Sequence, residues 1–230
     1  MIGTLYIVST PIGNLKDTTN RSLELLSDVD LIAAEDTRRT GILLKHYKIK
    51  TPLVSFNSYN QVKKSSHLIT RLKEGHNLAL VSDAGTPGVS DPLYYLVTAS
   101  LAAFVPVVSV PGPSAVLAAL TVSGLPVNRF VFEGFLPRKK GRKKLIEELA
   151  KEKRTIVLFE SPHRITKTLK ELFQAMGERK AVLARELTKI HEEVIRGTLE
   201  DLATIAEAKK LKGEITLVIS GVPKNSNRGN

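Results

Sequence analysis

The chain has 230 residues, of which 42% are hydrophobic and 25% charged, an ordinary balance for a globular protein. It contains no cysteine, which excludes disulfides, thiolate metal sites and a cysteine nucleophile. No signal-peptide pattern is visible, and the longest apolar stretch, residues 93–110, is too interrupted by polar residues and proline to cross a membrane. We therefore expect a cytoplasmic protein without membrane contact, long enough for one large core or two modest ones.

The net charge of +11 is unevenly distributed. Residues 1–124 contain 11 Lys and Arg against 9 Asp and Glu, whereas residues 125–230 contain 23 against 14. Much of the excess lies in the run RKKGRKK at 138–144. A run of like charges is either a solvated helix start or a contact for a phosphate backbone, and both interpretations stay open.

Through the first half of the chain, apolar runs typical of strands alternate with apolar residues at helical spacing. The expected strands are 4–9, 31–34, 52–56, 78–82 and 107–110. Helices are expected around 23–26, 42–47, 68–72, 93–104 and 115–121. Because the strands are continuously apolar, this order predicts an α/β domain with a mainly parallel sheet covered on both faces.

The segment SGLPVNR at 123–129 contains glycine, proline and asparagine and is the expected domain boundary. The predicted domains are therefore 1–124 and 125–222, followed by a polar tail at 223–230. The second domain should contain strands at 130–135, 155–159, 181–184 and 214–220. It should also contain a basic helix that ends at 151 and helices at 165–176 and 199–208. A short strand within 192–198 indicates antiparallel pairing, and therefore a mixed sheet.

Three loops of small residues, glycine and proline follow expected strands in the first domain. Their sequences are STPIGN at 9–14, SDAGTPGVSDP at 82–92 and VPGPSA at 110–115. Small side chains let the backbone approach a ligand closely and recognise it through N–H and C=O groups. The three loops therefore predict a binding crevice at the carboxyl ends of the strands.

Three polar clusters also follow expected strands, at 34–39 (AEDTRR), 159–164 (FESPHR) and 185–192 (RELTKIHE). Helix capping can explain Asp36 or Thr37, and the pair Ser161 and Pro162. It leaves the remaining acidic, basic and histidine residues of the clusters for function. No dinucleotide-binding glycine motif, Walker A loop or zinc-binding helix is present, and the five histidines lack metal-ligand spacing, so we expect no metal.

Taken together, these segments resemble the tetrapyrrole methylase superfamily. The resemblance is carried by residues 10–15, 34–38 and 82–92, and it extends from residue 3 to about residue 222. Further matches at 111–115, 159–164 and 185–189 resemble the branch that methylates the ribose 2′-hydroxyl of a cytidine in 16S ribosomal RNA.

The resemblance implies two α/β/α domains, the first with a mainly parallel sheet and the second with a mixed sheet. It also implies S-adenosylmethionine bound in the cleft between them, a homodimer, and 16S ribosomal RNA in the small ribosomal subunit as partner. The residues that it places at the cofactor are Pro11, Gly85, Thr86, Pro87, Val89, Ser114, Ala115, Phe159, Ala184, Glu186, Glu214 and Ile215.

Methyl transfer from a sulfonium to a hydroxyl needs aligned reactants, a dry site and, usefully, a base for the hydroxyl proton. The catalytic candidates are Glu35, Asp36, Glu160, Glu186 and Lys189, with His163 as a further base. Glu186 and Lys189 can equally form a structural ion pair. Replacing Glu35 or Glu186 by glutamine is expected to lower turnover with little change in cofactor affinity. Since guanidinium and ammonium groups bind phosphates, the RNA-binding candidates are Arg38, Arg138, Lys139, Lys140, Arg142, Arg164 and Arg185.

Two other functions are compatible with parts of the sequence. A methyltransferase acting on a corrin or porphyrin precursor would also use basic residues, because such substrates carry many carboxylates. The combination of the 159–164 cluster with the basic run 138–154 favours the ribosomal branch. A non-catalytic RNA-binding module would leave the three small-residue loops unexplained.

Overall fold

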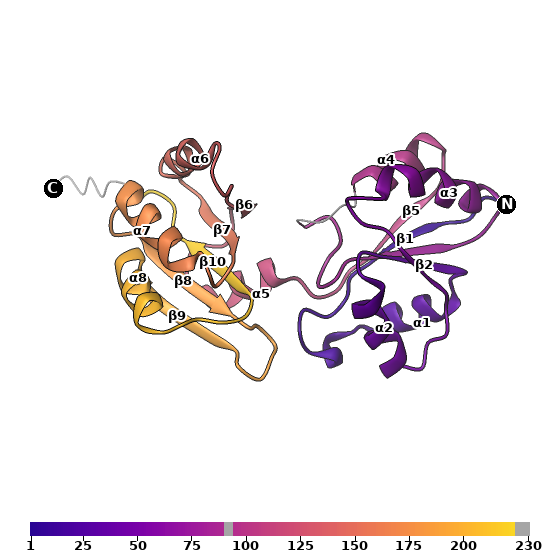
Figure 1. Ribbon diagram of the computed structural model, residues 1–230, viewed down its shortest axis with the longest axis horizontal. Coiled ribbons are helices and arrows are strands. Elements are labelled where there is room, and N and C mark those ends of the chain that lie inside the picture. Colours follow the sequence, from indigo (N-terminus) through magenta and orange to yellow (C-terminus); the bar gives the residue numbers. More distant parts are fainter. Residues whose placement is uncertain (90–93, 224–230) are drawn as a thin grey trace. The chain divides into compact units, whose positions relative to one another are not determined.

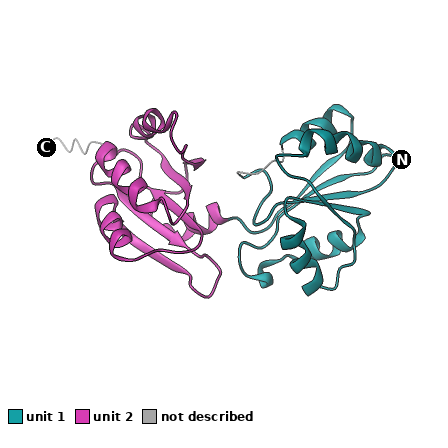
Figure 2. Ribbon diagram, in the orientation of Figure 1, with its two compact units in different colours: residues 1–114 teal, residues 115–230 magenta. Residues whose placement is uncertain are grey.

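The computed structural model describes residues 1–89 and 94–223, and the chain divides into two compact units, 1–114 and 115–230 (Figure 2). The division falls after Ser114, earlier than the boundary expected after Gly124. The reason is helix α5 (Ala115–Ser123), which contacts strands of the second sheet and therefore belongs to unit 2. The expected cleft between the domains stays a prediction.

Unit 1 contains a five-stranded sheet in which every neighbouring pair is parallel. Its strands are β1 (Leu5–Val8), β2 (Leu31–Ala34), β3 (Leu53–Ser55), β4 (Leu78–Val81) and β5 (Val107–Val110), in the order β3-β2-β4-β1-β5. All residues of β2 and β4 are buried, which is why these strands are continuously apolar. The expected parallel sheet is confirmed.

Helices cover both faces of this sheet (Figure 1). On one face, α1 (Asn20–Asp28) and α2 (Thr37–His46) share a core with Val8 of β1. On the other face, α3 (Gln61–Lys73) and α4 (Tyr94–Ala102) share a core with Leu5 and Ile7 of the same strand. Alternate residues of β1 thus enter opposite cores, as the two-residue period of a strand requires.

Unit 2 contains a five-stranded mixed sheet, as expected. Its strands are β6 (Phe130–Phe135), β7 (Thr155–Glu160), β8 (Lys180–Arg185), β9 (Glu193–Thr198) and β10 (Ile215–Ile219), in the order β6-β7-β10-β8-β9. The β6–β7 pair is parallel, whereas the other three pairs are antiparallel. The last strand of the chain therefore lies in the centre of the sheet.

The helices α6 (Arg142–Leu149), α7 (Ile165–Met176) and α8 (Leu199–Ala208) share one apolar core with this sheet. Their buried leucines recur at helical spacing, as Leu169 and Leu172 do on α7. Helix α5 contacts β9 and β10 instead.

The expected bounds of β2, β5, β6, α7 and α8 agree with the structure. Helix α2 begins earlier than expected because Asp36 caps it. Ser90, Asp91 and Pro92 of the long loop, and residues 224–230 of the expected tail, lie outside the described residues. Within the described ranges, no helix is both long and apolar enough to cross a membrane.

Candidate functional site

The strand order of unit 1 places β4, β1 and β5 side by side, so the loops that follow them meet at one edge of the sheet. Thr10 and Gly85 exchange two backbone hydrogen bonds: the Thr10 N–H donates to Gly85 O over 2.9 Å, and the Gly85 N–H donates to Thr10 O over 3.0 Å. A Cβ built on Gly112 would lie 2.9 Å from Cβ of Ser9. The three small-residue loops are therefore packed closely together.

Hydroxyl groups connect the same loops. The Ser9 hydroxyl donates to Thr86 Oγ1 over 3.1 Å, and Thr86 Oγ1 in turn donates to the carbonyl of Pro113, also over 3.1 Å. Thr10 Oγ1 donates to the carbonyl of Ser82 over 3.2 Å. Gly85 has a φ of +78°, a conformation that favours glycine, so the loop after β4 needs glycine at this position.

The polar cluster after β2 is bound to the loop after β4. The backbone N–H of Asp36 donates to Asp83 Oδ1 over 2.9 Å, and the Asp83 N–H donates to Glu35 Oε2 over 3.3 Å. Arg39 Nε lies 3.7 Å from Asp83 Oδ2. Asp83 thus connects Glu35 and Asp36 to the edge where the three loops meet.

Asp36 has a structural task of its own. Its Oδ1 accepts the N–H of Arg38 over 2.8 Å and caps α2, and Arg38 Nη2 lies 2.6 Å from its Oδ2. Hydrogen bonding to Arg38 lowers the pKa of Asp36 to about 2, so the carboxylate stays ionised at neutral pH. The Arg38 side chain remains 89% exposed.

In unit 2, the Glu160 carboxylate is enclosed at the end of β7, with 2% of the residue exposed. It accepts hydrogen bonds from the Thr168 hydroxyl over 2.6 Å and from the Ser161 N–H over 2.7 Å, and Arg164 Nε lies 3.4 Å away. A buried carboxylate with these partners is well satisfied within its own unit, which favours a structural role.

Arg142 continues this network. It donates to Glu171 Oε2 over 2.7 Å, to Thr168 Oγ1 over 2.8 Å and to the carbonyl of Pro137 over 3.1 Å, and only 8% of it is exposed. Arg164 donates to the carbonyl of Leu136 over 2.7 Å. Both arginines connect the chain after β6 to α7, so their guanidinium groups are used within the unit.

A second polar network joins the end of β8 to the start of β10. The Lys189 ammonium donates to Glu186 Oε1 over 2.8 Å and to Glu214 Oε2 over 3.1 Å. The Glu214 N–H also donates to Glu186 Oε1 over 2.9 Å. Glu186 has a φ of +50° and Gly213 a φ of +89°, and a Cβ on Gly213 would overlap the Glu186 carboxyl group. The absence of a side chain at Gly213 therefore leaves room for the Glu186 carboxyl group beside the start of β10.

These contacts fix the charges of the pair. The hydrogen bond from Lys189, supported by the backbone N–H of Glu214, lowers the pKa of Glu186. Burial alone would lower the pKa of Lys189, but its hydrogen bonds to the two carboxylates outweigh burial and raise that pKa. Both groups are therefore charged at neutral pH, as expected of a structural ion pair.

The unit 2 residues expected at a cofactor lie together at one end of the sheet. Phe159 and Ala184 flank Thr216 of β10 on its two sides, and the neighbouring Ile215 lies between Glu160 and Arg185. Arg185 donates to Glu193 Oε2 over 2.8 Å. In unit 1, the expected residues Pro11, Gly85, Thr86, Pro87 and Val89 all lie in the loops described above, while Ser114 ends unit 1 and Ala115 begins α5.

Several residues that organise these sites were not among the sequence-based candidates: Ser9, Thr10, Asp83, Gly112 and Gly213. Four of them stand within the loops quoted from the sequence, but their contacts with distant segments leave no mark on the local pattern. Gly213 carries a signal, since a glycine directly before a strand often marks close backbone approach. Arg138, Lys139 and Lys140 lie exposed in the turn before α6.

Comparison with known proteins gives the family. The protein-family model "Tetrapyrrole (Corrin/Porphyrin) Methylases" matches residues 4–203. The ribosomal RNA small subunit methyltransferase I of Thermotoga maritima is 51% identical over 220 residues, covering 96% of this chain and 99% of the relative. The protein of the same name from Escherichia coli O157:H7 is 48% identical, covering 95% of this chain and 78% of the relative.

Solved structures agree on the fold. Cobalt precorrin-4 methyltransferase CbiF aligns with a TM-score of 0.69 at 21% identity, covering 94% of each chain. Uroporphyrin-III C-methyltransferase from Thermus thermophilus, solved with S-adenosylhomocysteine, aligns with a TM-score of 0.67 at 20% identity, covering 96% of this chain and 98% of that one. The chain therefore belongs to the tetrapyrrole methylase family, in the group of the ribosomal RNA small subunit methyltransferase I proteins.

Proposed function

We propose that this protein is a cytoplasmic enzyme that transfers a methyl group from S-adenosylmethionine to the ribose 2′-hydroxyl of a cytidine in 16S ribosomal RNA. The observation that carries the proposal is the joining of three small-residue loops at the carboxyl edge of β4, β1 and β5. They occur in a chain that is about half identical, over nearly its whole length, to relatives named for ribosomal RNA methylation.

The residues of this edge fit an adenosyl cofactor. Within the described part of the three loops, Asp83 is the only ionisable side chain, and it faces Asp36 and Arg39. Backbone groups and hydroxyls are therefore the available recognition elements, and the close approach at Gly112 leaves little room for side chains. When bound, the cofactor supplies an activated methyl group on a positively charged sulfur.

We assign the binding of the cofactor to residues of both units. In unit 1, Pro11 and the segment Gly85–Val89 would contact it, with Ser114 and Ala115 at the end of the third loop. In unit 2, Phe159, Ala184 and the segment 214–215 would contact it through their backbone. Glu186 and Lys189 act as positioning residues, since their ion pair fixes the segment that follows β8 against the start of β10.

Glu35 is the residue that we assign to accept the proton of the 2′-hydroxyl. Glu35 lies at the carboxyl end of β2 and accepts the Asp83 N–H, which places it beside the loop after β4. A base in this position would contribute about 10²–10⁴-fold to the rate.

Ribosomal RNA is preferred as substrate over a corrin or porphyrin precursor. The relatives with the higher identity, at 51% and 48%, are named for ribosomal RNA, whereas the aligned enzymes named for precorrin and uroporphyrin share 21% and 20%. The net charge of +11 also suits a polyanionic partner. The small ribosomal subunit is accordingly the substrate to test.

The protein should form a homodimer through exposed apolar side chains. Helix α5 and strand β6 are two candidate surfaces, since Leu117 and Phe135 are each 55% exposed. Helix α4 offers a third surface, since its Tyr94 is 74% exposed and Phe104, just after the helix, is 87% exposed. Light scattering coupled to size-exclusion chromatography should give twice the mass of 25.2 kDa, and a monomeric mass would refute the dimer.

Isothermal titration with S-adenosylmethionine, followed by transfer of a tritiated methyl group to unmodified 30S subunits, tests the proposed function. Binding together with label on a cytidine ribose is the expected result. Binding with label on a porphyrin precursor, but none on the subunit, would establish the alternative substrate. Absence of binding would refute the methyltransferase proposal.

A further inference from the structure

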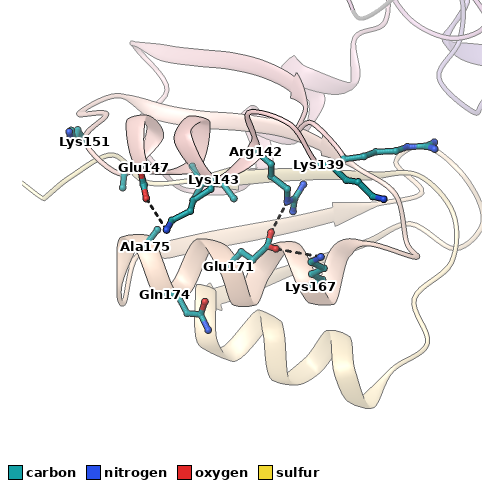
Figure 3. A pocket seen from close by; sticks show the side chains of 12 residues that line it. Lys139, Arg142, Lys143, Glu147, Lys151, Lys167, Glu171, Gln174 and Ala175 are labelled. Atoms are coloured by element: carbon teal, nitrogen blue, oxygen red, sulfur yellow. Dashed lines mark hydrogen bonds and ion pairs between the residues drawn. The ribbon is translucent and has the colours of Figure 1, made fainter.

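A basic groove lies between α6 and α7 of unit 2, with a volume of about 1010 Å³. Six Lys and Arg side chains line it against two Glu side chains, so the groove carries a net positive charge. Figure 3 shows Lys139 and Lys151 at opposite ends of the groove, with Lys143 and Lys167 between them on the two helices. The cationic side chains are therefore spread along the groove rather than gathered at one point.

Most of these cations are available to a partner. Arg142 is the exception, because it is 8% exposed and donates to Glu171, Thr168 and Pro137. Lys143 lies 3.9 Å from Glu147 and Lys167 lies 3.8 Å from Glu171, with side chains that are 92% and 74% exposed. Exposed ion pairs at such separations hold their partners weakly, so both ammonium groups can turn to another anion.

The stability of α6 does not account for this charge. The helix dipole favours acidic residues in the first turn, but the first turn of α6 contains none and instead begins with Arg142 and Lys143. The N-cap residue Gly141 provides no side-chain hydrogen bond either. Arg142 is used within the unit, but the exposed Lys143 acts against the dipole of its own helix. A ligand of negative charge would account for a lysine at this position.

The positive surface extends beyond the groove. A second hollow of about 1040 Å³ shares Lys151 with it and is also lined by six Lys and Arg side chains against two Glu side chains. Its cations include Arg129, Lys153 and Lys180, which come from the amino ends of β6, β7 and β8. A small anionic ligand needs one site, whereas two adjoining basic hollows match a polyanion with regularly repeated charges.

We propose that the groove between α6 and α7 is the surface on which the phosphate backbone of ribosomal RNA docks. This inference rests on the proposed function for the identity of the nucleic acid. Lys143 and Lys167 contact phosphates from the two sides of the groove, and Arg138 and Lys139 extend the contact at its end. Arg142 does not contact RNA itself. Its hydrogen bonds to Glu171 and Thr168 hold α6 against α7 and so fix the two sides of the groove.

A matched pair of double variants tests this surface. Lys143→Gln with Lys167→Gln removes two cations from the groove. Lys144→Gln with Lys170→Gln removes two cations from the same helices but outside the lining residues, and Lys144 has an equivalent pair with Glu148 at 3.8 Å. The two proteins therefore have the same net charge and differ in where the charge was lost.

The measurement is the affinity for protein-free 16S RNA at a series of salt concentrations. Each lost phosphate contact should lower the slope of log affinity against log salt by about 1, so the groove double variant should lose about 2. The control double variant should keep the slope of the wild type. Equal slopes for the two double variants would overturn the docking surface.

Two further readouts separate the alternatives. Phosphatidylserine vesicles that bind the wild type but not the groove variant, with an unchanged RNA slope, would assign the groove to a membrane and overturn the proposal. Titration with S-adenosylmethionine should give the same affinity for both double variants and the wild type. If the wild type bound no cofactor, the proposed methyl transfer would fail, while the comparison of RNA slopes would still decide the docking surface.

Discussion

The Lys189 ammonium donates a hydrogen bond to the Glu186 carboxylate over 2.8 Å, and the same ammonium reaches Glu214 over 3.1 Å. Glu186 occupies the left-handed region with a φ of +50°, as does Thr188 with a φ of +67°. For a non-glycine residue this conformation is costly, so the surrounding contacts must hold it. The ion pair is one of the contacts that do so.

The first prediction concerns the pH dependence of this ion pair. Because the pKa of Glu186 is lowered below its ordinary value of 4.5, the pair stabilises the fold above that pH and is lost as the pH falls through the lowered pKa. At neutral pH, Glu186→Gln should lower the free energy of unfolding by about 1.5 kcal/mol, the net contribution of a charged hydrogen bond. Urea unfolding across the acid range should show this difference shrinking as Glu186 becomes protonated.

The exposed pair of Lys144 and Glu148, separated by 3.8 Å, provides the control. Glu148→Gln should change the free energy of unfolding little at any pH, because exposed pairs contribute little. A constant difference between wild type and Glu186→Gln down to the lowest pH would show that the ion pair is not what stabilises this segment.

The second prediction uses Gly213, whose missing side chain makes room for Glu186. Gly213→Ala places a Cβ into the Glu186 carboxyl group and should displace it from Lys189. Gly141 has a similar φ of +80° in the left-handed region, but a Cβ there would meet nothing within 4 Å. Both substitutions should therefore cost about 1–2 kcal/mol of stability from backbone strain.

Only Gly213→Ala should also weaken cofactor binding, because it moves the backbone at 184–186 and 214–215 that we assign to the cofactor. The loss of one charged hydrogen bond corresponds to about tenfold in the dissociation constant of S-adenosylmethionine. Calorimetry on the two alanine variants measures this directly. Equal affinities would remove the cofactor role from the 186–214 network.

The third prediction concerns Thr86, whose hydroxyl connects all three small-residue loops. Thr86→Val keeps the shape of the side chain but loses the bonds to Ser9 and to Pro113, at about 1 kcal/mol each. Thr204→Val loses a single bond, to the carbonyl of Glu200, at an exposed position of α8 and serves as control. Thermal unfolding and cofactor titration should both report a larger effect for Thr86→Val, and equal effects would mean that the loops are held by their backbones alone.

The sequence predicted the elements well because continuous apolar runs such as those of β2 and β4, each buried throughout, are typical of central strands in a parallel sheet. It also identified the three loops, since glycine and proline determine local backbone geometry. It could not reveal that Glu160 is enclosed by Thr168 and Arg164. The local sequence around a glutamate at a strand end does not indicate whether its side chain is buried or exposed. The boundary at Gly124 differed for a related reason: Gly and Pro mark a turn, whereas the packing of α5 decides which unit a helix joins.

The fourth prediction separates a structural Glu160 from a catalytic one. Removing one partner of a buried ion pair costs about 3–5 kcal/mol, so Glu160→Ala should strongly destabilise unit 2. Glu160→Gln should be milder, and well below its unfolding temperature it should keep turnover within about tenfold of the wild type. A catalytic base would behave in the opposite way, with wild-type stability and a turnover lower by about 10²–10⁴-fold.

The fifth prediction is that Glu35→Gln lowers the rate of methyl transfer to 30S subunits by about 10²–10⁴-fold, with the dissociation constant of S-adenosylmethionine close to that of the wild type. The amide can still accept the Asp83 N–H that Glu35 Oε2 accepts over 3.3 Å, so the loop should keep its place while the proton acceptor is lost. Glu74→Gln, at an exposed position after α3, is the control and should transfer methyl groups like the wild type.

Glu186→Gln and Glu35→Gln should differ in their effects on turnover and on cofactor affinity. From the sequence, Glu186→Gln was expected to act like Glu35→Gln, but the ion pair with Lys189 changes that expectation. Because Glu186 holds the backbone that we assign to the cofactor, its replacement should raise the dissociation constant of S-adenosylmethionine, whereas Glu35→Gln should lower turnover alone. Single-turnover rates at saturating cofactor distinguish the two, and wild-type turnover in Glu35→Gln would exclude Glu35 as the base.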